Sequence, residues 1–350
     1  MRAAEFDLQR MVRPSIIDLK PYASAKEEFK DFEKELIYLD ANENPFDDGM
    51  NRYPDPHQKE LKARIAEIRG VPESRILLGN GSDEVLDMIY RVFLEPGKDN
   101  IIISVPTFGM FEVLAQVNNV ACRKVLLDGS FQMQVSDIKS VMDQHTKAVF
   151  VCSPNNPTGN LMRQEDIRDL LALPVLVVVD EAYIDFAPGN SLLSLLDEHA
   201  NLIVTQTFSK AYGLAGIRLG MCFASEQIID LLKKVKMPYN VNVLTQRTAL
   251  QQLEDEEGYV REVRAILEQR KYLQNALRQV SYVSEVFDSD SNFLLVRVDD
   301  ANRRYEQLIR HGLVVRNRTR EPLLENCMRI TVGTEAENYK LIQEMKAIEN

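Results

Sequence analysis

The sequence predicts an α/β protein with a large lobe, in which a mostly parallel sheet lies between helices, and a smaller α+β lobe. Short unbroken runs of branched apolar residues alternate with amphipathic stretches through residues 41–255, which is typical of strands buried on both faces of a doubly wound sheet. From about residue 256 the pattern changes to a long, charged amphipathic stretch. A chain of 350 residues is also longer than a single hydrophobic core usually accommodates, so two lobes of one subunit are expected.

The expected elements follow the chain in that order. Buried strands are predicted at residues 101–105, 148–152, 175–179, 202–205 and 219–224. An amphipathic helix is predicted after GNGSDE, residues 79–84, with Ser82 as its N-cap. The free backbone N–H groups at such a helix start form a site for an anion. In the smaller lobe the long helix is expected to reach about Val280, before strands near residues 293–298 and 329–331.

Residues capable of chemistry follow three of the predicted strands. Asp180 ends one strand, at the edge where open α/β sheets bind ligands. The turn SPNNPTG, residues 153–159, follows another strand at the same edge. A third segment, TFSKAYGLAGIRLG at residues 207–220, places Lys210 among hydroxyls and glycines and contains Arg218 near its end. A lysine in this setting can hold an aldehyde cofactor as a Schiff base while its neighbours hold a phosphate.

These segments, in this order and spacing, resemble the fold-type I aminotransferases that depend on pyridoxal 5'-phosphate (PLP), and the resemblance covers nearly the whole chain. It implies that Lys210 carries the cofactor and moves the proton of the reaction, and that Asp180 pairs with the pyridine nitrogen. Asn156 and Tyr183 would hydrogen-bond the phenolate oxygen of the ring, and Phe108 would stack on the ring face. The catalytic residues are then Lys210, Asp180 and Tyr183. The family more often has Tyr at the position of Phe108, so one hydroxyl contact is expected to be missing.

The same resemblance implies how the cofactor phosphate is held. Backbone N–H groups near Ser82 and Asp83 would bind it, together with the hydroxyls of Thr207 and Ser209 and the guanidinium of Arg218. Because a carboxylate beside a phosphate dianion is unfavourable, the carboxylate of Asp83 is expected to point away. An ordinary first-turn acid that favours the helix dipole is the alternative for Asp83.

Segments outside this set resemble the histidinol-phosphate aminotransferases specifically. They are LDANENPF at residues 39–46, NRYPDP at 51–56, VVRNR at 314–318 and CMRITVGT at 327–334. The resemblance implies reversible amino transfer between L-histidinol phosphate and 2-oxoglutarate, giving imidazole acetol phosphate and glutamate, in histidine biosynthesis. It also implies a homodimer with shared active sites, in which Tyr53 reaches the cofactor phosphate of the partner subunit.

Substrate binding is implied for residues in the arm and in the smaller lobe. The resemblance assigns the substrate phosphate to Tyr22, Arg316 and Arg329, with Asn42 nearby, and gives Arg329 the α-carboxylate of glutamate. The neighbouring loop arginines, Arg318 and Arg320, are expected to be solvated.

The resemblance further implies three regions. Residues 1–40 would form an arm that joins the small domain and the dimer partner. Residues 41–255 would form the large PLP-binding domain, and residues 256–350 the small C-terminal domain.

Composition excludes several classes of function. A net charge of -11 argues against nucleic acid or an anionic membrane as the main partner. The four cysteines form no C-x-x-C pair and the four histidines show no ligand spacing, so neither disulfides nor a metal site is expected. Neither a signal peptide nor an apolar run of membrane-spanning length is evident, and we expect a soluble cytoplasmic protein.

Two alternatives remain open at this level. An aromatic or broad-specificity aminotransferase, or a threonine-phosphate decarboxylase, would carry the same Lys210, Asp180 and Arg218. A PLP-sensing regulator on the same fold is less favoured, because nothing before Leu39 is long, periodic or basic enough to form a helix-turn-helix domain.

Overall fold

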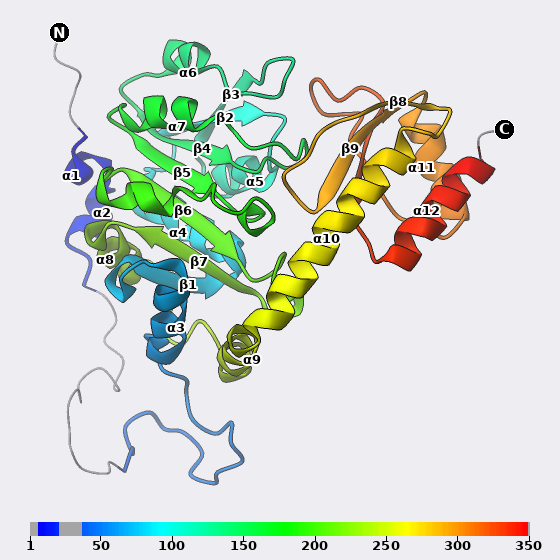
Figure 1. Ribbon diagram of the computed structural model, residues 1–350. Coiled ribbons are helices and arrows are strands. Elements are labelled where there is room, and N and C mark those ends of the chain that lie inside the picture. Colours follow the sequence, from blue (N-terminus) through cyan, green and yellow to red (C-terminus); the bar gives the residue numbers. More distant parts are fainter. Residues whose placement is uncertain (1–5, 21–36, 349–350) are drawn as a thin grey trace.

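The computed structural model describes residues 6–20 and 37–348, which form two lobes joined by one long helix (Figure 1). The large lobe contains a seven-stranded sheet of order β1-β7-β6-β5-β4-β2-β3. All neighbouring strands are parallel except β7, which is antiparallel to both β1 and β6. The strands are β1 (Ile76–Asn80), β2 (Asn100–Val105), β3 (Ala121–Leu126), β4 (Thr146–Cys152), β5 (Leu176–Asp180), β6 (Leu202–Thr207) and β7 (Leu219–Ala224).

The expected fold class is confirmed, and all five predicted strands of the large lobe are present. The sequence did not reveal β1 and β3. Strand β3 lies at the sheet edge and is largely exposed, with Arg123 and Lys124 among its residues, so it forms no apolar run. Strand β1 is short and ends in Gly79-Asn80, a pair typical of a turn.

Helices cover both faces of this sheet, so successive strand residues enter different cores. Val178 of β5 packs in the core that contains α4 and α8, whereas its neighbours Val177 and Val179 pack in the opposite core. Every residue of β5 is buried, as a parallel strand between two helical layers requires. The helices are α3 (Lys59–Arg69), α4 (Gly81–Phe93), α5 (Met110–Val117), α6 (Val135–Val141), α7 (Gln164–Leu171), α8 (Glu226–Val235) and α9 (Val243–Glu254), with short 3₁₀ turns at Glu73–Arg75, Ile184–Phe186, Leu192–Asp197 and Ala215–Ile217.

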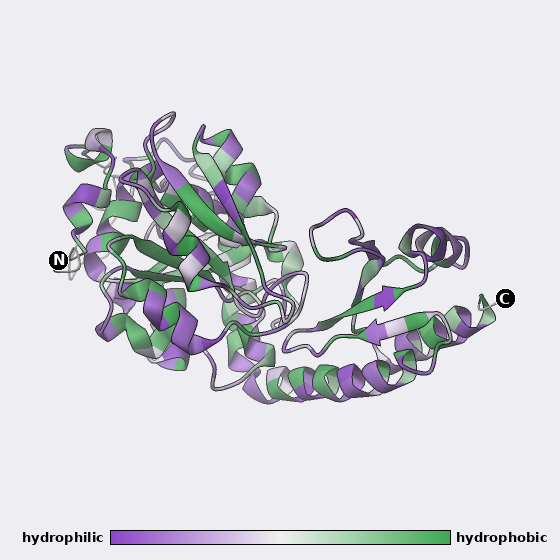
Figure 2. Cartoon of the chain, turned by 90° about the horizontal axis from the view of Figure 1, so that it is seen from above, coloured by the Kyte–Doolittle hydropathy of each residue, from purple (hydrophilic) through white to green (hydrophobic). Residues whose placement is uncertain are grey.

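The smaller lobe is an antiparallel four-stranded sheet, of order β10-β11-β9-β8, covered by helices. Figure 2 shows hydrophobic and hydrophilic residues alternating along α10, the helix that leaves the large lobe and packs on this sheet. Strands β8 and β10 were not predicted, because they are short and mostly exposed. The elements are α10 (Glu256–Leu277), β8 (Val283–Val286), β9 (Phe293–Val298), α11 (Ala301–Arg310), β10 (Arg316–Asn317), β11 (Cys327–Thr331) and α12 (Glu335–Ala347).

The described part of the N-terminal arm differs from the expectation. It contains α1 (Leu8–Met11) and α2 (Pro14–Ile17), and it packs against the large lobe, not the small one. Apolar side chains at its Met11, Val12 and Ile16 are buried in the core beside α4 and α8. The ammonium of Lys234, on α8, donates to the carbonyl of Ile17 at 2.7 Å. Burial of these apolar residues accounts for the docking on the large lobe.

The start of α4 also corrects an expectation. The helix begins at Gly81 with Asn80 as its N-cap, and Ser82 is the second helical residue rather than the cap. Asn80 makes no capping hydrogen bond with its side chain. Its backbone N–H donates to the carboxylate of Glu84, four residues on, which resembles the return bond of a capping box. The apolar face of α4 is buried as predicted, through Leu86, Ile89, Tyr90 and Phe93.

No helix among residues 6–20 and 37–348 is long and apolar enough to cross a membrane.

The backbones of strand β7 and of the start of α4 lie closer together than would be possible with a side chain between them. A Cβ atom at Gly220 would lie 2.2 Å from the backbone nitrogen of Ser82. One at Gly81 would lie 2.6 Å from Nη2 of Arg218, and the φ of +78° at Gly81 is itself a glycine conformation. Glycine at both positions therefore lets the helix start lie directly against β7 and Arg218.

Replacing Gly220 with alanine should lower the free energy of unfolding by about 1–3 kcal/mol, because the added methyl group meets backbone that cannot move aside. Urea unfolding followed by circular dichroism measures this change. The matched control is Gly216→Ala, where the new methyl group would meet no atom within 4 Å. Equal unfolding midpoints for the two variants would contradict the tight contact.

Candidate active site

A single pocket at the carboxyl edge of the parallel strands brings together every large-lobe residue assigned to the cofactor from the sequence, apart from Tyr53. Strands β4, β5 and β6 end at this edge, and the start of α4 closes it. The predicted residues that line the pocket are Ser82, Asp83, Phe108, Asn156, Asp180, Tyr183, Thr207, Ser209, Lys210 and Arg218.

Sequence analysis missed two residues of this pocket, Cys152 and Ala182. Cys152 is the last residue of β4 and lies beside Asp180 in the parallel register of β4 and β5. Its place at the end of an apolar run directly before SPNNPTG was the signal that could have identified it. Burial raises the pKa of the Cys152 thiol well above its ordinary value, so this side chain stays neutral.

Asp180 presents a buried carboxylate at the floor of the pocket. The side chain is 2% exposed and accepts hydrogen bonds from the backbone N–H of Ala182 at 3.1 Å and from the hydroxyl of Thr205 at 3.2 Å. Burial raises the pKa of Asp180 to about 6, despite these two bonds. A buried anion of this kind is stabilised by a cation that binds against it.

Lys210 supplies an amine in the same pocket. Burial lowers the pKa of Lys210, and the positive charge of Arg329 lowers it further. Its Nζ lies 5.5 Å from the centroid of the Tyr183 ring. An amine with a lowered pKa is more often unprotonated, which is the form needed for nucleophilic attack and for accepting a proton.

Asn156 is oriented by two arginines of the smaller lobe. Its Oδ1 accepts hydrogen bonds from Nη1 of Arg329 and from Nη2 of Arg318, the latter at 3.4 Å. Within the described part of the chain its side-chain NH₂ makes no hydrogen bond, so it is free to donate to a ligand oxygen. Tyr183 packs edge-on against Phe293 of β9, and burial raises the pKa of Tyr183, which keeps its hydroxyl a donor.

Hydroxyls, an arginine and a helix start surround the opposite end of the pocket. The hydroxyl of Thr207 lies 3.0 Å from that of Ser209 and accepts from the Ser209 backbone N–H. Nη2 of Arg218 lies 3.2 Å from the carboxylate of Asp83. The expectation that Asp83 points away was therefore wrong, because the guanidinium over Gly81 attracts it. The ion pair is half exposed and adds little stability, so Arg218 can turn toward a stronger anion.

The arginines of β10 and β11 lie beside this pocket. Arg316 stands directly opposite Arg329 in the antiparallel pair. Burial lowers the pKa of Arg329, and the positive charges of Arg318 and Arg316 lower it further. Arg316 is exposed and lines a separate surface pocket together with Arg318 and Arg320. The expectation that Arg318 is merely solvated was wrong, because its side chain reaches Asn156.

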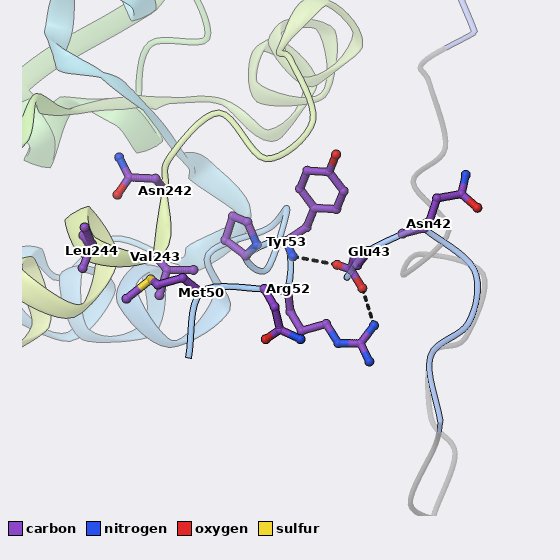
Figure 3. A pocket seen from close by; sticks show the side chains of 11 residues that line it. Asn42, Glu43, Met50, Arg52, Tyr53, Asn242, Val243 and Leu244 are labelled. Carbon is purple, nitrogen blue, oxygen red and sulfur yellow. Dashed lines mark hydrogen bonds and ion pairs between the residues drawn. The ribbon is translucent and has the colours of Figure 1, made fainter. Parts of the chain in front are cut away.

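Tyr53 and Asn42 lie in a different pocket, shown in Figure 3, between residues 41–54 and 242–244. The Tyr53 ring stacks on Tyr239 with 4.5 Å between centroids. The Glu43 carboxylate accepts from Nη1 of Arg52 and from the backbone N–H of Tyr53, both at 2.7 Å. Neither Tyr53 nor Asn42 lines the Lys210 pocket within this chain.

Asn42 is therefore not brought to Arg316 and Arg329 here, and the remaining substrate candidate, Tyr22, lies outside the described residues.

Asp180→Asn should stabilise the cofactor-free protein at pH 8 by about 2–3 kcal/mol, because the difference between a pKa of about 6 and the ordinary 3.8 is a cost of burying the charge. The raised pKa means that the wild-type protein loses this stability as pH rises from about 4 through 6. Urea titrations at pH 8 and pH 5 measure it. The gain should shrink at pH 5, where wild-type Asp180 is mostly protonated, and a gain that is equal at both pH values would contradict a buried charge.

Comparison with known proteins gives concordant results. A model of the family "Aminotransferase class I and II" matches residues 23–345. A histidinol-phosphate aminotransferase of Flavobacterium johnsoniae is 53% identical over 345 residues, covering 98% of this chain and 99% of that protein.

Solved structures agree with the fold. The histidinol-phosphate aminotransferase from Clostridium acetobutylicum gives a TM-score of 0.80 at 25% identity, covering 86% of this chain and 91% of that one. The enzyme of the same name from Sinorhizobium meliloti, in complex with pyridoxal-5'-phosphate, gives a TM-score of 0.78 at 24% identity over 85% and 83% of the two chains. The chain thus belongs to the class I and II aminotransferases and, within them, to the histidinol-phosphate aminotransferase family.

Proposed function

We propose that the chain catalyses reversible, PLP-dependent amino transfer between L-histidinol phosphate and 2-oxoglutarate, giving imidazole acetol phosphate and glutamate. The observation that carries the proposal is one pocket that contains a lysine of lowered pKa, a buried aspartate, the hydroxyls of two side chains and Arg218, with Arg329 at its rim. Identity of 53% to the Flavobacterium johnsoniae enzyme over nearly the full length favours this substrate pair over those of other aminotransferases and of threonine-phosphate decarboxylase.

The residues of the pocket fit PLP at both of its ends. Gly81 and Gly220 let the start of α4 lie close beside Arg218, and the hydroxyls of Thr207 and Ser209 line the same pocket. Backbone N–H groups, hydroxyls and a guanidinium are the donors that a phosphate dianion prefers. The buried carboxylate of Asp180 suits a protonated ring nitrogen. Bound PLP supplies an aldehyde that condenses with amines and a ring that withdraws electrons from the bond broken at the substrate carbon.

Each side chain of the pocket has its own role in the proposed reaction. Lys210 Nζ removes the proton from the amine-bearing carbon of the substrate, because burial and Arg329 favour its neutral form. Asp180 holds a proton on the ring nitrogen through its buried carboxylate. The hydroxyl of Tyr183 and the free NH₂ of Asn156 donate to the ring's phenolate oxygen, and Phe108 covers the ring face.

Arginines of the smaller lobe would bind the anionic ends of both substrates. Arg329 lies at the rim of the pocket through its bond to Asn156 and would take the α-carboxylate of glutamate. The charge of Arg316, directly opposite in the strand pair, would add to the attraction for the phosphate of histidinol phosphate. One set of guanidinium groups can serve a phosphate and a carboxylate in turn.

We further propose that residues 41–255 form the PLP-binding domain and residues 256–350 a small domain that brings the substrate arginines to it. The active enzyme is proposed to be a homodimer. Tyr53 supports this, because within its own chain it is half exposed and lines a pocket other than that of Lys210.

Single-turnover mixing tests the substrate assignment. The purified PLP form is mixed with histidinol phosphate, phenylalanine or threonine phosphate, and the absorption band of the lysine-bound cofactor is followed as pyridoxamine phosphate forms. We expect fast conversion with histidinol phosphate and its reversal by 2-oxoglutarate, and Lys210→Ala should bind PLP but show neither the band nor turnover. Preferred conversion of phenylalanine, or carbon dioxide release from threonine phosphate, would assign the chain to a different reaction.

Shared active sites predict complementation between two defective chains. Tyr53→Phe alone should weaken cofactor retention severalfold through loss of one hydrogen bond. A hybrid dimer of Lys210→Ala and Tyr53→Phe chains would contain one site in which both residues are intact.

Tandem affinity purification of differently tagged chains isolates this hybrid. At limiting cofactor, one of the two sites of the hybrid should retain PLP better than the sites of the Tyr53→Phe homodimer do. A catalytically competent monomer with full PLP affinity would reject the shared site.

A further inference from the structure

A loop of the smaller lobe, residues 287–291, lies against the large-lobe turn that carries Asn156. The backbone N–H of Asp290 donates to the carbonyl of Gly159 at 2.7 Å. The carboxylate of Asp290 accepts from the backbone N–H of Leu161 at 2.9 Å. Asp290 therefore holds the turn at two points, and these two bonds together are called the Asp290 clasp.

The clasp lies within a close contact between the lobes. A Cβ atom at Gly159 would lie 2.5 Å from Oγ of Ser289, and the φ of +89° at Gly159 is itself a glycine conformation. The Phe287 ring packs edge-on against Phe131 of the large lobe, with 5.2 Å between centroids. The glycine thus lets the backbones of the two lobes meet at the point where the clasp forms.

The loop that carries Asp290 is held by its own lobe. Nη1 of Arg270, on α10, donates to the carbonyl of Ser291 at 2.6 Å, which fixes the backbone beside Asp290. Burial lowers the pKa of Arg270 and the negative charge of Asp290 raises it, so the two side chains attract each other. The hydroxyl of Ser289 donates to the carbonyl of Phe293, at the start of β9, at 2.6 Å. The clasp is therefore anchored to α10 and β9.

The turn that the clasp holds also determines where Asn156 lies. The backbone N–H of Gly159 donates to the carbonyl of Asn155 at 2.7 Å. The backbone N–H of Asn155 in turn donates to the carbonyl of Asn160 at 2.8 Å. These bonds tie the 159–161 end of the turn to the residue directly before Asn156, so a movement of that end would be transmitted to the Asn156 side chain.

We propose that Asp290 is a positioning residue, which holds Asn156 where its side-chain NH₂ donates to the ring oxygen of the cofactor. Asp290 acts across the boundary between the lobes, so the placement of the smaller lobe is coupled to a ring contact of the large one. This inference rests on the proposed function for the identity of the cofactor, but not for the existence of the clasp.

An absorption titration of the PLP-loaded protein tests this role. A donor to the ring oxygen favours the form of the lysine-bound cofactor that has lost its proton, so a misplaced Asn156 should raise the pH midpoint. Loss of the Asp290 charge alone would lower the midpoint, because a negative charge favours the protonated form. We expect Asp290→Ala to raise the midpoint by about half a pH unit. Asp290→Asn, which retains an acceptor for the Leu161 N–H, should not raise it.

Two comparisons assign the effect to Asn156. Asp288→Ala is the matched control, because the Asp288 side chain is 94% exposed and accepts from Gln274 of its own lobe. Its midpoint should equal that of wild type. Asn156→Ala should itself raise the midpoint, and the addition of Asp290→Ala should then change it little. Additive shifts in the double variant would overturn the inference.

Hydrogen exchange of the purified full-length protein tests the clasp without a signal from the cofactor. The Leu161 amide should exchange about fivefold faster in Asp290→Ala than in wild type, whereas Asp288→Ala should leave its rate unchanged. Unchanged exchange in Asp290→Ala would overturn the inference, as would faster exchange with an unchanged absorption midpoint. A wild-type protein that binds no PLP would reject the proposed function, and exchange at Leu161 would still decide whether the clasp exists.

Discussion

The rest of the site depends on one buried charge. The carboxylate of Asp180 sits at the end of β5, where every strand residue is buried, and two hydrogen bonds do not offset the loss of water, since its pKa remains raised. A charge in this position destabilises the empty protein and is satisfied by a cation bound against it. In the proposed function, that cation is the protonated ring nitrogen of PLP, whose binding would offset the cost of burying Asp180.

The parallel sheet explains why the remaining groups surround that charge. Strands β4, β5 and β6 run in the same direction, so Cys152, Asp180 and Thr207 end at one edge although they are far apart in the sequence. Strand β7 returns antiparallel, and its Gly220 lets the start of α4 close the pocket from the side. Backbone geometry thereby sets the distance between Asp180 and the start of α4.

Contacts between the lobes bring arginines of the smaller lobe to the Lys210 pocket. Tyr259 of α10 stacks on Tyr212 of the large lobe with 4.5 Å between centroids, and Phe293 of β9 meets Tyr183. Within the large lobe, Arg69 of α3 makes a bidentate ion pair with Asp185, at 2.7 and 3.0 Å. The two ring contacts join the lobes, and Arg318 and Arg329 of the smaller lobe donate to Asn156 of the large one.

The sequence by itself determined the strands with apolar runs and the residues at their ends, because periodicity and chain order are local and parallel strands share an edge. The roles of Lys210, Asp180 and their pocket neighbours were implied by the resemblance of their motifs to those of PLP-dependent aminotransferases. Only the tertiary structure decided that Arg318 reaches Asn156, 162 residues away, that Asp83 turns toward Arg218, and that residues 6–20 dock on the large lobe. Each of these depends on a charge or an apolar surface brought near by folding, and no local pattern records which distant partner will satisfy it.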